Sequence, residues 1–111
     1  MRVVSMIGGL LALTANAQMA PNAREFMRAM DVSMKTMDRD MAAAPMNGDA
    51  DHDFAAMMLP HHQGAIDMAK AELSFGKDAV MRRLAQGILV EQQSEIDAMK
   101  LWLTKSEKKK R

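Results

Sequence analysis

Two adjacent histidines, His61 and His62, stand near the middle of the sequence among methionines. Residues four apart are neighbours on a helix surface, so Met57 lies beside His61 and Met58 lies beside His62. Met68 continues the line that Met57 and His61 begin. Imidazole nitrogen and thioether sulfur form a soft donor set, which favours Cu(I) over Cu(II) and over ions that prefer oxygen. The pattern therefore predicts a copper site with Cu(I) as the preferred ion.

Sulfur is abundant throughout the chain, and all of it belongs to methionine. The 111 residues contain 14 methionines, one tryptophan and no cysteine, which excludes disulfides and thiolate metal sites. Between residues 27 and 41 a methionine recurs every three or four positions, which is the spacing of one helix face. Such a stripe is either a packing surface or a set of soft ligands. The candidates for additional ligands are Met30, Met34, Met37 and Met99.

Two polar residues, Gln92 and Glu95, fall within an apolar stripe near the C-terminus. A polar group on a core face costs free energy unless a buried partner forms a hydrogen bond with it. The imidazoles of the preceding segment are the expected partners. Gln92 and Glu95 are therefore predicted to orient the two histidines without themselves binding the metal.

Hydrophobic periodicity predicts an all-α fold with three helices, spanning about residues 22–44, 51–74 and 79–106. The Pro-Met-Asn-Gly run at 45–48 ends the first helix, and Asp51 is the expected N-cap of the second. Gly76 is suited to a left-handed cap at the end of that helix. Both connections are short, so consecutive helices should pack antiparallel in a small bundle.

The two ends of the chain differ from its body. Arg2, an apolar run and Ala15-Asn16-Ala17 are typical of a secretory signal peptide at residues 1–17, which predicts an exported or periplasmic protein. A metal-binding domain is then expected over residues 18–106, followed by a solvated basic tail at 107–111. No other segment is long and apolar enough for stable membrane insertion. The basic tail lacks interleaved aromatic residues, so nucleic-acid binding is not expected.

Enzyme signatures are missing from the sequence. No glutamate precedes a histidine by three residues, as in a di-iron carboxylate centre, and no G-x-S-x-G motif is present. A non-enzymatic binding protein is expected, while a redox role that cycles copper stays open.

The run from Asp53 to Ala69, which includes Leu59-Pro60-His61-His62-Gln63, resembles the uncharacterised-domain family numbered 305. The pattern Gln92-x-x-Glu95-Ile96-x-x-Met99-x-x-Trp102-Leu103 is similar to the second signature of that family. The resemblance implies a ferritin-like helical fold, export, and kinship with periplasmic copper-binding proteins linked to copper resistance. It also implies ligand roles for the two histidines and for Met57, Met58 and Met68.

The sequence thus predicts a copper-binding protein that serves copper buffering, transfer or resistance, with a copper-transfer protein as a candidate partner. The alternative is a helical interaction module whose methionine-rich face binds a partner protein. Two adjacent inward imidazoles favour the metal, because a partner-binding groove does not require them. A three-helix unit with an exposed methionine stripe could also form a homo-oligomer.

Overall fold

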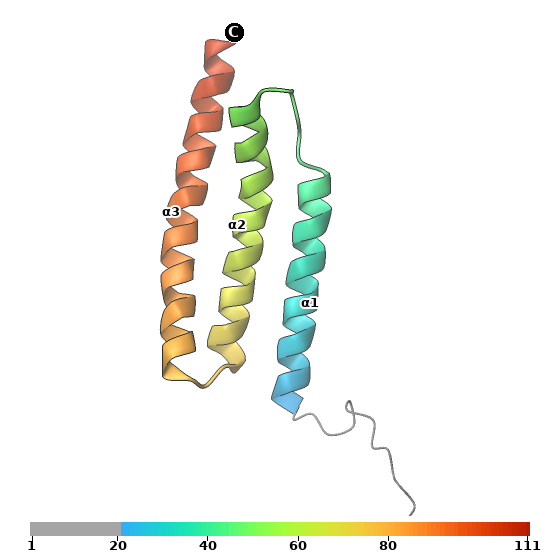
Figure 1. Cartoon of the computed structure of the whole chain (residues 1–111), viewed down its shortest axis with the longest axis vertical. Helices are drawn as coiled ribbons and strands as arrows, with labels where there is room; N and C mark the ends of the chain where they lie inside the picture. The colour runs from blue at the N-terminus through green and yellow to red at the C-terminus, as the bar shows by residue number, and fades with distance from the viewer. Residues whose placement is uncertain (1–20) are drawn as a thin grey trace, which may run out of the picture.

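The computed structural model describes residues 21–111, which form three α-helices and no strand (Figure 1). The prediction of an all-α antiparallel bundle is confirmed. The predicted signal peptide at residues 1–17 lies outside the described residues. The helices are α1 at Pro21–Ala42, α2 at Ala50–Phe75 and α3 at Ala79–Lys109.

The connection between α1 and α2 is built from polar side chains and one glycine. Gly48 has φ of 88°, a left-handed conformation that glycine adopts without steric cost. Asp49 is the N-cap of α2, and its side chain accepts a hydrogen bond of 2.9 Å from the His52 amide. The prediction of Asp51 as the cap was wrong, because Asp49 reaches the free amide first and α2 begins one residue before Asp51.

The connection between α2 and α3 is also capped, but without a left-handed residue. Gly76 has φ of −73°, so the predicted left-handed cap was wrong. Arg82 of α3 fastens this turn by donating to the carbonyls of Leu73 at 2.7 Å and Gly76 at 3.0 Å. Asp78 then caps α3 by accepting hydrogen bonds from the first free amides of that helix. The helix continues to Lys109, so most of the predicted basic tail is helical.

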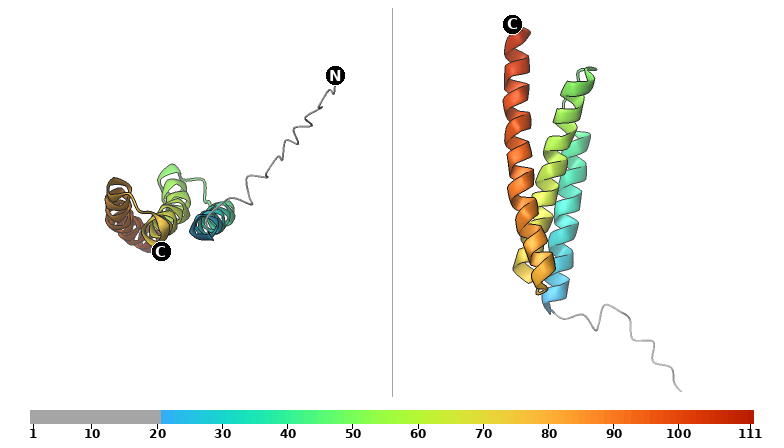
Figure 2. Two further views of the ribbon diagram at one scale, coloured as in Figure 1. Left: turned by 90° about the horizontal axis from the view of Figure 1, so that it is seen from below. Right: turned by 60° about the vertical axis from the view of Figure 1, so that its left-hand side comes forward.

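The three helices form one open layer with α2 in the middle. Within residues 21–111, α1 and α3 each pack against α2 and make no contact with each other. Seen end-on, the helices lie in a row (Figure 2). Because α2 is contacted on two opposite sides, both broad surfaces of the layer remain open. The ferritin-like arrangement usually needs four helices, so this part of the expectation stays a prediction.

Small residues allow the helices of this layer to approach closely. The buried apolar residues are five alanines and two isoleucines, and no large side chain in the described part of the chain is fully buried. At the α1–α2 contact, a Cβ atom on Gly64 would lie 2.6 Å from the Met37 sulfur. The hydrophobic core is therefore thin, and most large apolar side chains keep part of their surface exposed.

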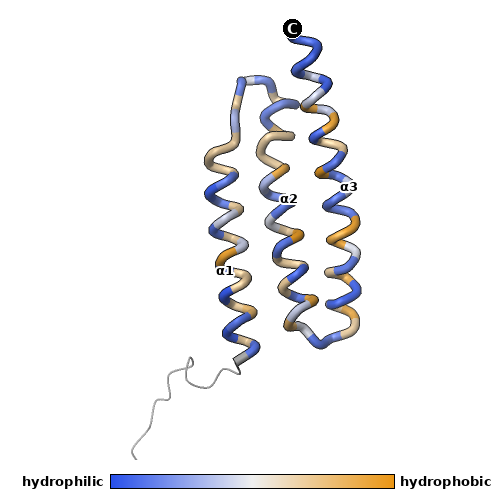
Figure 3. Tube along the Cα trace, turned by 180° about the vertical axis from the view of Figure 1, so that it is seen from behind, coloured by the Kyte–Doolittle hydropathy of each residue, from blue (hydrophilic) through white to orange (hydrophobic). Residues whose placement is uncertain are grey.

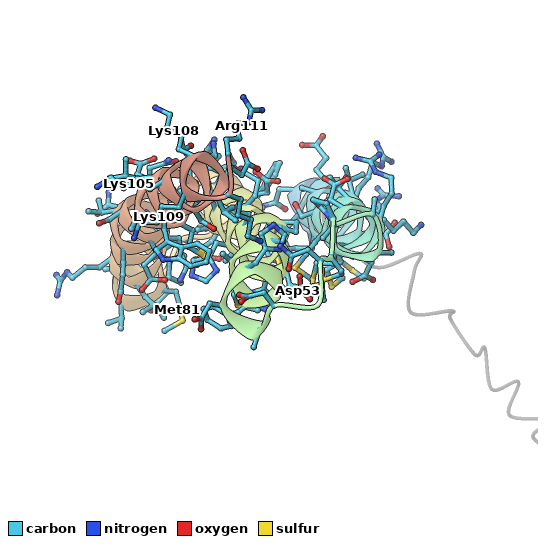
Figure 4. All side chains as sticks on the ribbon, turned by 90° about the horizontal axis from the view of Figure 1, so that it is seen from above. Asp53, Met81, Lys105, Lys108, Lys109 and Arg111 are labelled. Carbon is cyan, nitrogen blue, oxygen red and sulfur yellow. The ribbon has the colours of Figure 1, made fainter. Side chains whose placement is uncertain are left out.

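The two broad surfaces of the layer differ in chemistry. Hydrophobic and hydrophilic positions alternate every few residues along each helix (Figure 3). Helical periodicity of about 100° per residue places the methionines of all three helices on one surface. Sulfur atoms gather on the side toward which Met81 points, while Lys108 and Arg111 point the other way (Figure 4). We call the first surface the methionine face. By helical periodicity and by the groove linings, it carries Met27, Met30, Met34, Met41, Phe54, Met58, His61, Met68, Met81, Leu84, Met99 and Trp102.

No helix within residues 21–111 combines the length and the apolar character that crossing a membrane requires.

Candidate metal site

His62 lies on α2 where that helix meets α3, and only 14% of its side chain is exposed. Its Nε2 atom forms a hydrogen bond with a carboxylate oxygen of Glu95 on α3. Glu95 itself is 50% exposed, so its second oxygen can remain in water. The contact joins two helices through residues 33 positions apart. Glu95 therefore fixes the orientation of the imidazole ring from outside.

The second ring nitrogen of His62, Nδ1, is buried and has no hydrogen-bond partner. A carboxylate only accepts hydrogen bonds, so the proton between the two residues belongs to Nε2 of His62. In the neutral ring, Nδ1 then carries a free lone pair. A buried polar atom without a partner costs free energy and calls for an explanation. An unprotonated imidazole nitrogen held in this way has the form of a metal ligand oriented by a carboxylate.

A groove of about 320 Å³ opens beside this histidine on the methionine face. Its lining combines residues of α2 and α3: Phe54, Met58, His62, Glu95, Ala98 and Met99. Met58 is one helical turn from His62, and Met99 lies one turn beyond Glu95 on the facing helix. Two thioethers and one imidazole therefore share a largely apolar groove. This donor chemistry suits a soft ion.

His61 points in a different direction from its neighbour. Its side chain is exposed on the methionine face, whereas the sequence predicted that both rings would flank the core. The two ring centroids are 6.0 Å apart and the rings are tilted by 58°. A metal–imidazole bond is about 2 Å long, so rings at this separation can still approach one ion from two sides. His61 is thus near the groove but does not line it.

The other predicted ligands lie outside this groove. Met57 and Met68 are half-buried on α2, and Met68 lines a second groove between α2 and α3. Met37 packs against Gly64 at the α1–α2 contact. Met30 is half-buried and Met34 is exposed. The structure therefore separates Met58 and Met99, which line the groove beside His62, from the other predicted methionine ligands.

Gln92 is half-buried on α3, one turn before Ile96. The hydrogen bond that fixes His62 comes from Glu95 alone. Phe54 and Ala98 line the groove, although neither was predicted as a site residue. Phe54 lies four residues before Met58, and Ala98 lies three residues after Glu95. Residues at those spacings share a helix face, so the sequence could have indicated both as neighbours of the site.

His52 lies at the start of α2, next to the connection from α1. Its side chain is only 13% exposed, and Nδ1 donates a hydrogen bond of 3.0 Å to Asp53. Asp53 also accepts from the Asn47 amide at 2.8 Å and the Gly48 amide at 3.1 Å. These bonds to His52 and to the loop hold the pKa of Asp53 below its ordinary value. His52 therefore belongs to the connection between α1 and α2, away from the groove.

Carboxylates and imidazoles alone do not form a metal site in the described part of the chain. Residues 21–111 contain no cluster of three or more histidine, aspartate and glutamate side chains that could hold an ion. A metal at His62 would therefore depend on thioether sulfur for further donors.

Comparison with known proteins gives one result. No curated protein matches the sequence. A family model described as a domain of unknown function (DUF305) matches residues 4–103, which is most of the chain. The two signature runs around His61-His62 and around Glu95 both fall within this match. The chain therefore belongs to the DUF305 family.

Proposed function

We propose that this protein is an exported copper-binding protein that holds Cu(I) in the groove beside His62, for copper buffering, transfer or resistance. The observation that carries the proposal is the buried Nδ1 atom of His62, which has no hydrogen-bond partner, in a residue that lines a groove together with two methionines. An imidazole that lacks a hydrogen-bond partner on its inner nitrogen gains most from a metal ion in that place.

The donor set supports Cu(I) in particular. Zinc accepts imidazole but gains little from thioethers, and its sites in proteins usually include cysteine or carboxylate. Mg²⁺ and Ca²⁺ prefer oxygen donors. Met58 and Met99 contribute polarizable sulfur from two different helices, and His61 is close enough to add a second nitrogen. The further methionines along α1 could serve as additional weak ligands or as a path for transfer to a partner protein.

The central experiment is a competition of the mature protein with a chromophoric Cu(I) chelator. We expect tight binding of Cu(I) and much weaker binding of Zn(II). His62→Ala should abolish the groove site, whereas His61→Ala should weaken it less. Replacing Met58 and Met99 by leucine preserves volume, so the fold should change little while Cu(I) affinity falls.

Met46→Leu is the matched control, because Met46 is an exposed methionine in the loop between α1 and α2. Its replacement removes one thioether without touching the groove and should leave the affinity unchanged. If the Met58/Met99 double variant holds Cu(I) as tightly as the parent, the thioethers are only packing residues and the copper proposal fails.

Export is a separate part of the proposal and rests on the pattern of residues 1–17. The mature protein should begin at Gln18, so its intact mass from native cells should lack those residues. Recovery of the full-length chain from the cytoplasm would refute export without affecting the metal site.

The alternative function is a module that binds partner proteins through the methionine face. It is favoured by the number of large apolar side chains exposed there, including Phe54, Met81 and Leu84. Flexible thioethers adapt to varied surfaces, as promiscuous binding proteins require. The copper competition separates the two functions, because an interaction module has no need of the His62–Glu95 pair.

A further inference from the structure

The methionine face exposes more apolar surface than a folded monomer usually leaves in water. Six of its large side chains each keep about half of their surface uncovered. They are Met27, Met34, Phe54, Met81, Leu84 and Trp102. Each exposes on the order of 100 Å², so together they approach the roughly 800 Å² per partner of a standard interface. Half-buried methionines around them supply the remaining area.

Two open grooves follow the α2–α3 contact on this face. One, of about 280 Å³, is lined by Ala65, Met68 and Ala69 of α2 and by Met81, Leu84 and Ile88 among others. The second is the groove beside His62. Side chains of a facing helix pair could fill both grooves, since ridges of one helix pack into grooves of another.

The interior of the layer is small, so the single chain is expected to have low stability. Only two large apolar side chains, Ile66 and Ile96, are buried within residues 21–111. Burial of one such side chain contributes about 1.5–3 kcal/mol, and the chain has no disulfide to add stability. The single chain therefore has little stability of its own, and a permanent cover over the methionine face would stabilise it more than a transient one. A second copy of the same chain provides such a cover.

We propose that two copies of this chain pack with their methionine faces together. Twofold pairing of one surface with itself is the commonest form of homo-oligomer. The patch is predominantly apolar, as is typical of permanent dimers, and Glu72 and Glu95 are the charged residues that line its two grooves. The partner copy closes the groove beside His62 and covers His61, both of which are open to water in the single chain. This last consequence rests on the proposed copper function, but the dimer itself does not.

Sedimentation of the metal-free mature protein over a wide range of concentrations tests the dimer. We expect twice the mass of one chain. Leu84→Glu places a charge on the methionine face at a side chain that is 56% exposed, and it should give a folded monomer. Val90→Glu is the matched control on the same helix. Val90 is 75% exposed and lies on the opposite flank of α3, so this variant should remain dimeric.

A monomeric parent chain, or a Leu84→Glu variant that dimerises as well as the parent, overturns the proposal. If circular dichroism shows that Leu84→Glu is unfolded, Met81→Glu, at a second exposed position on the face, takes its place. The single tryptophan, Trp102, provides an independent readout on the face. A soluble quencher should reach it more readily in the Leu84→Glu variant than in the parent or the Val90→Glu variant.

The outcome is independent of copper, because every measurement uses metal-free protein. A dimer that binds no Cu(I) refutes the copper proposal alone. A monomer that binds Cu(I) with high affinity refutes the dimer alone.

Discussion

At the scale of single residues, the two neighbouring histidines of α2 lie in different environments. Adjacent residues on a helix are about 100° apart, so His61 and His62 cannot both face α3. His62 meets Glu95 of α3, and His61 lies on the open methionine face. Only His62 is therefore held in one orientation by a hydrogen bond to another helix.

Glu95 provides the sharpest test at this scale. Its carboxylate accepts the Nε2 proton of His62 and thereby keeps the other ring nitrogen free. We expect Glu95→Gln to weaken Cu(I) affinity about 10–100-fold, as is typical when the residue that orients a ligand is lost. Chelator competition measures the change.

Glu91→Gln is the matched control for that substitution. Glu91 is an exposed carboxylate one turn earlier on α3, and it lines a different groove. The Glu91→Gln substitution removes the same charge without touching His62, so the Cu(I) affinity of this variant should equal that of the parent. Equal losses in both variants would show that Glu95 acts only through its charge.

At the scale of helices, the α1–α2 contact depends on the missing side chain at Gly64. A Cβ atom there would lie 2.6 Å from the Met37 sulfur and 2.9 Å from Met37 Cβ, so α1 itself would have to move. Overpacking of this kind lowers the free energy of unfolding by about 1–3 kcal/mol, whereas the higher helix propensity of alanine raises it by about 1 kcal/mol. We expect Gly64→Ala to lower the free energy of unfolding by about 1 kcal/mol in urea titrations.

Gly87 supplies the control, because a Cβ atom at that position meets nothing within 4 Å. Gly87→Ala should raise the free energy of unfolding by up to about 1 kcal/mol, since only helix propensity changes. A Gly64→Ala variant as stable as the Gly87→Ala variant would contradict the close approach of α1 and α2.

The connection before α2 predicts a dependence of stability on pH. Asp53 accepts bonds from His52, Asn47 and Gly48, which hold its pKa below the ordinary value of about 3.9. A carboxyl with a lowered pKa in the folded state stabilises the fold fully above that ordinary value. Its contribution is lost as the pH falls through the lowered pKa. Thermal unfolding should therefore show a steeper loss of stability below about pH 4 in the parent than in Asp53→Asn.

Much of the helical structure could be predicted from the sequence, because its signals are local. Proline, glycine and capping aspartates lie close to the ends of α1, α2 and α3, and the predicted boundaries are within a few residues of the observed ones. The error at Asp51 arose because Asp49, two residues earlier, could also serve as the cap. At Gly76 the residue was right, but the chain leaves α2 in an extended conformation and not in a left-handed one. Local signals also placed Glu95 on the face of α3 that turns toward α2.

The open layer could not be predicted in the same way. Periodicity indicates which face of a helix is apolar, but it does not say which element covers that face. The wide methionine stripe of α1 and the apolar stripe of α3 both exceed the width of one helix contact. The sequence therefore predicted a small bundle but not its small alanine contacts or the extent of the exposed methionine face.

At the scale of the whole molecule, stability should depend on what the methionine face and the groove bind. Any species that binds only the folded state raises its stability by mass action. We expect the melting temperature of the metal-free protein to rise with protein concentration, because dimers form at the methionine face. Leu84→Glu should melt at a lower temperature that does not vary with concentration.

Cu(I) should raise the melting temperature further, by an amount set by its affinity. At a free concentration of about 100 times Kd, one bound ion adds about 2.7 kcal/mol. The same addition to the His62→Ala variant should have little effect. Differential scanning calorimetry with a buffered Cu(I) source measures the melting temperatures of the parent and of His62→Ala. An equal rise in the two proteins would show that the ion binds at a site other than the groove beside His62.

The contact of α2 with its two sequence neighbours also sets the order in which the chain can assemble. Every tertiary contact in the layer joins consecutive helices, so folding needs only two hairpin closures and should be fast. The α1–α2 hairpin uses no residue beyond Phe75, so its contacts do not require α3. It contains His61 and the methionines of α1, whereas His62 still lacks Glu95 until α3 has docked. The groove beside His62 is therefore the last feature to form.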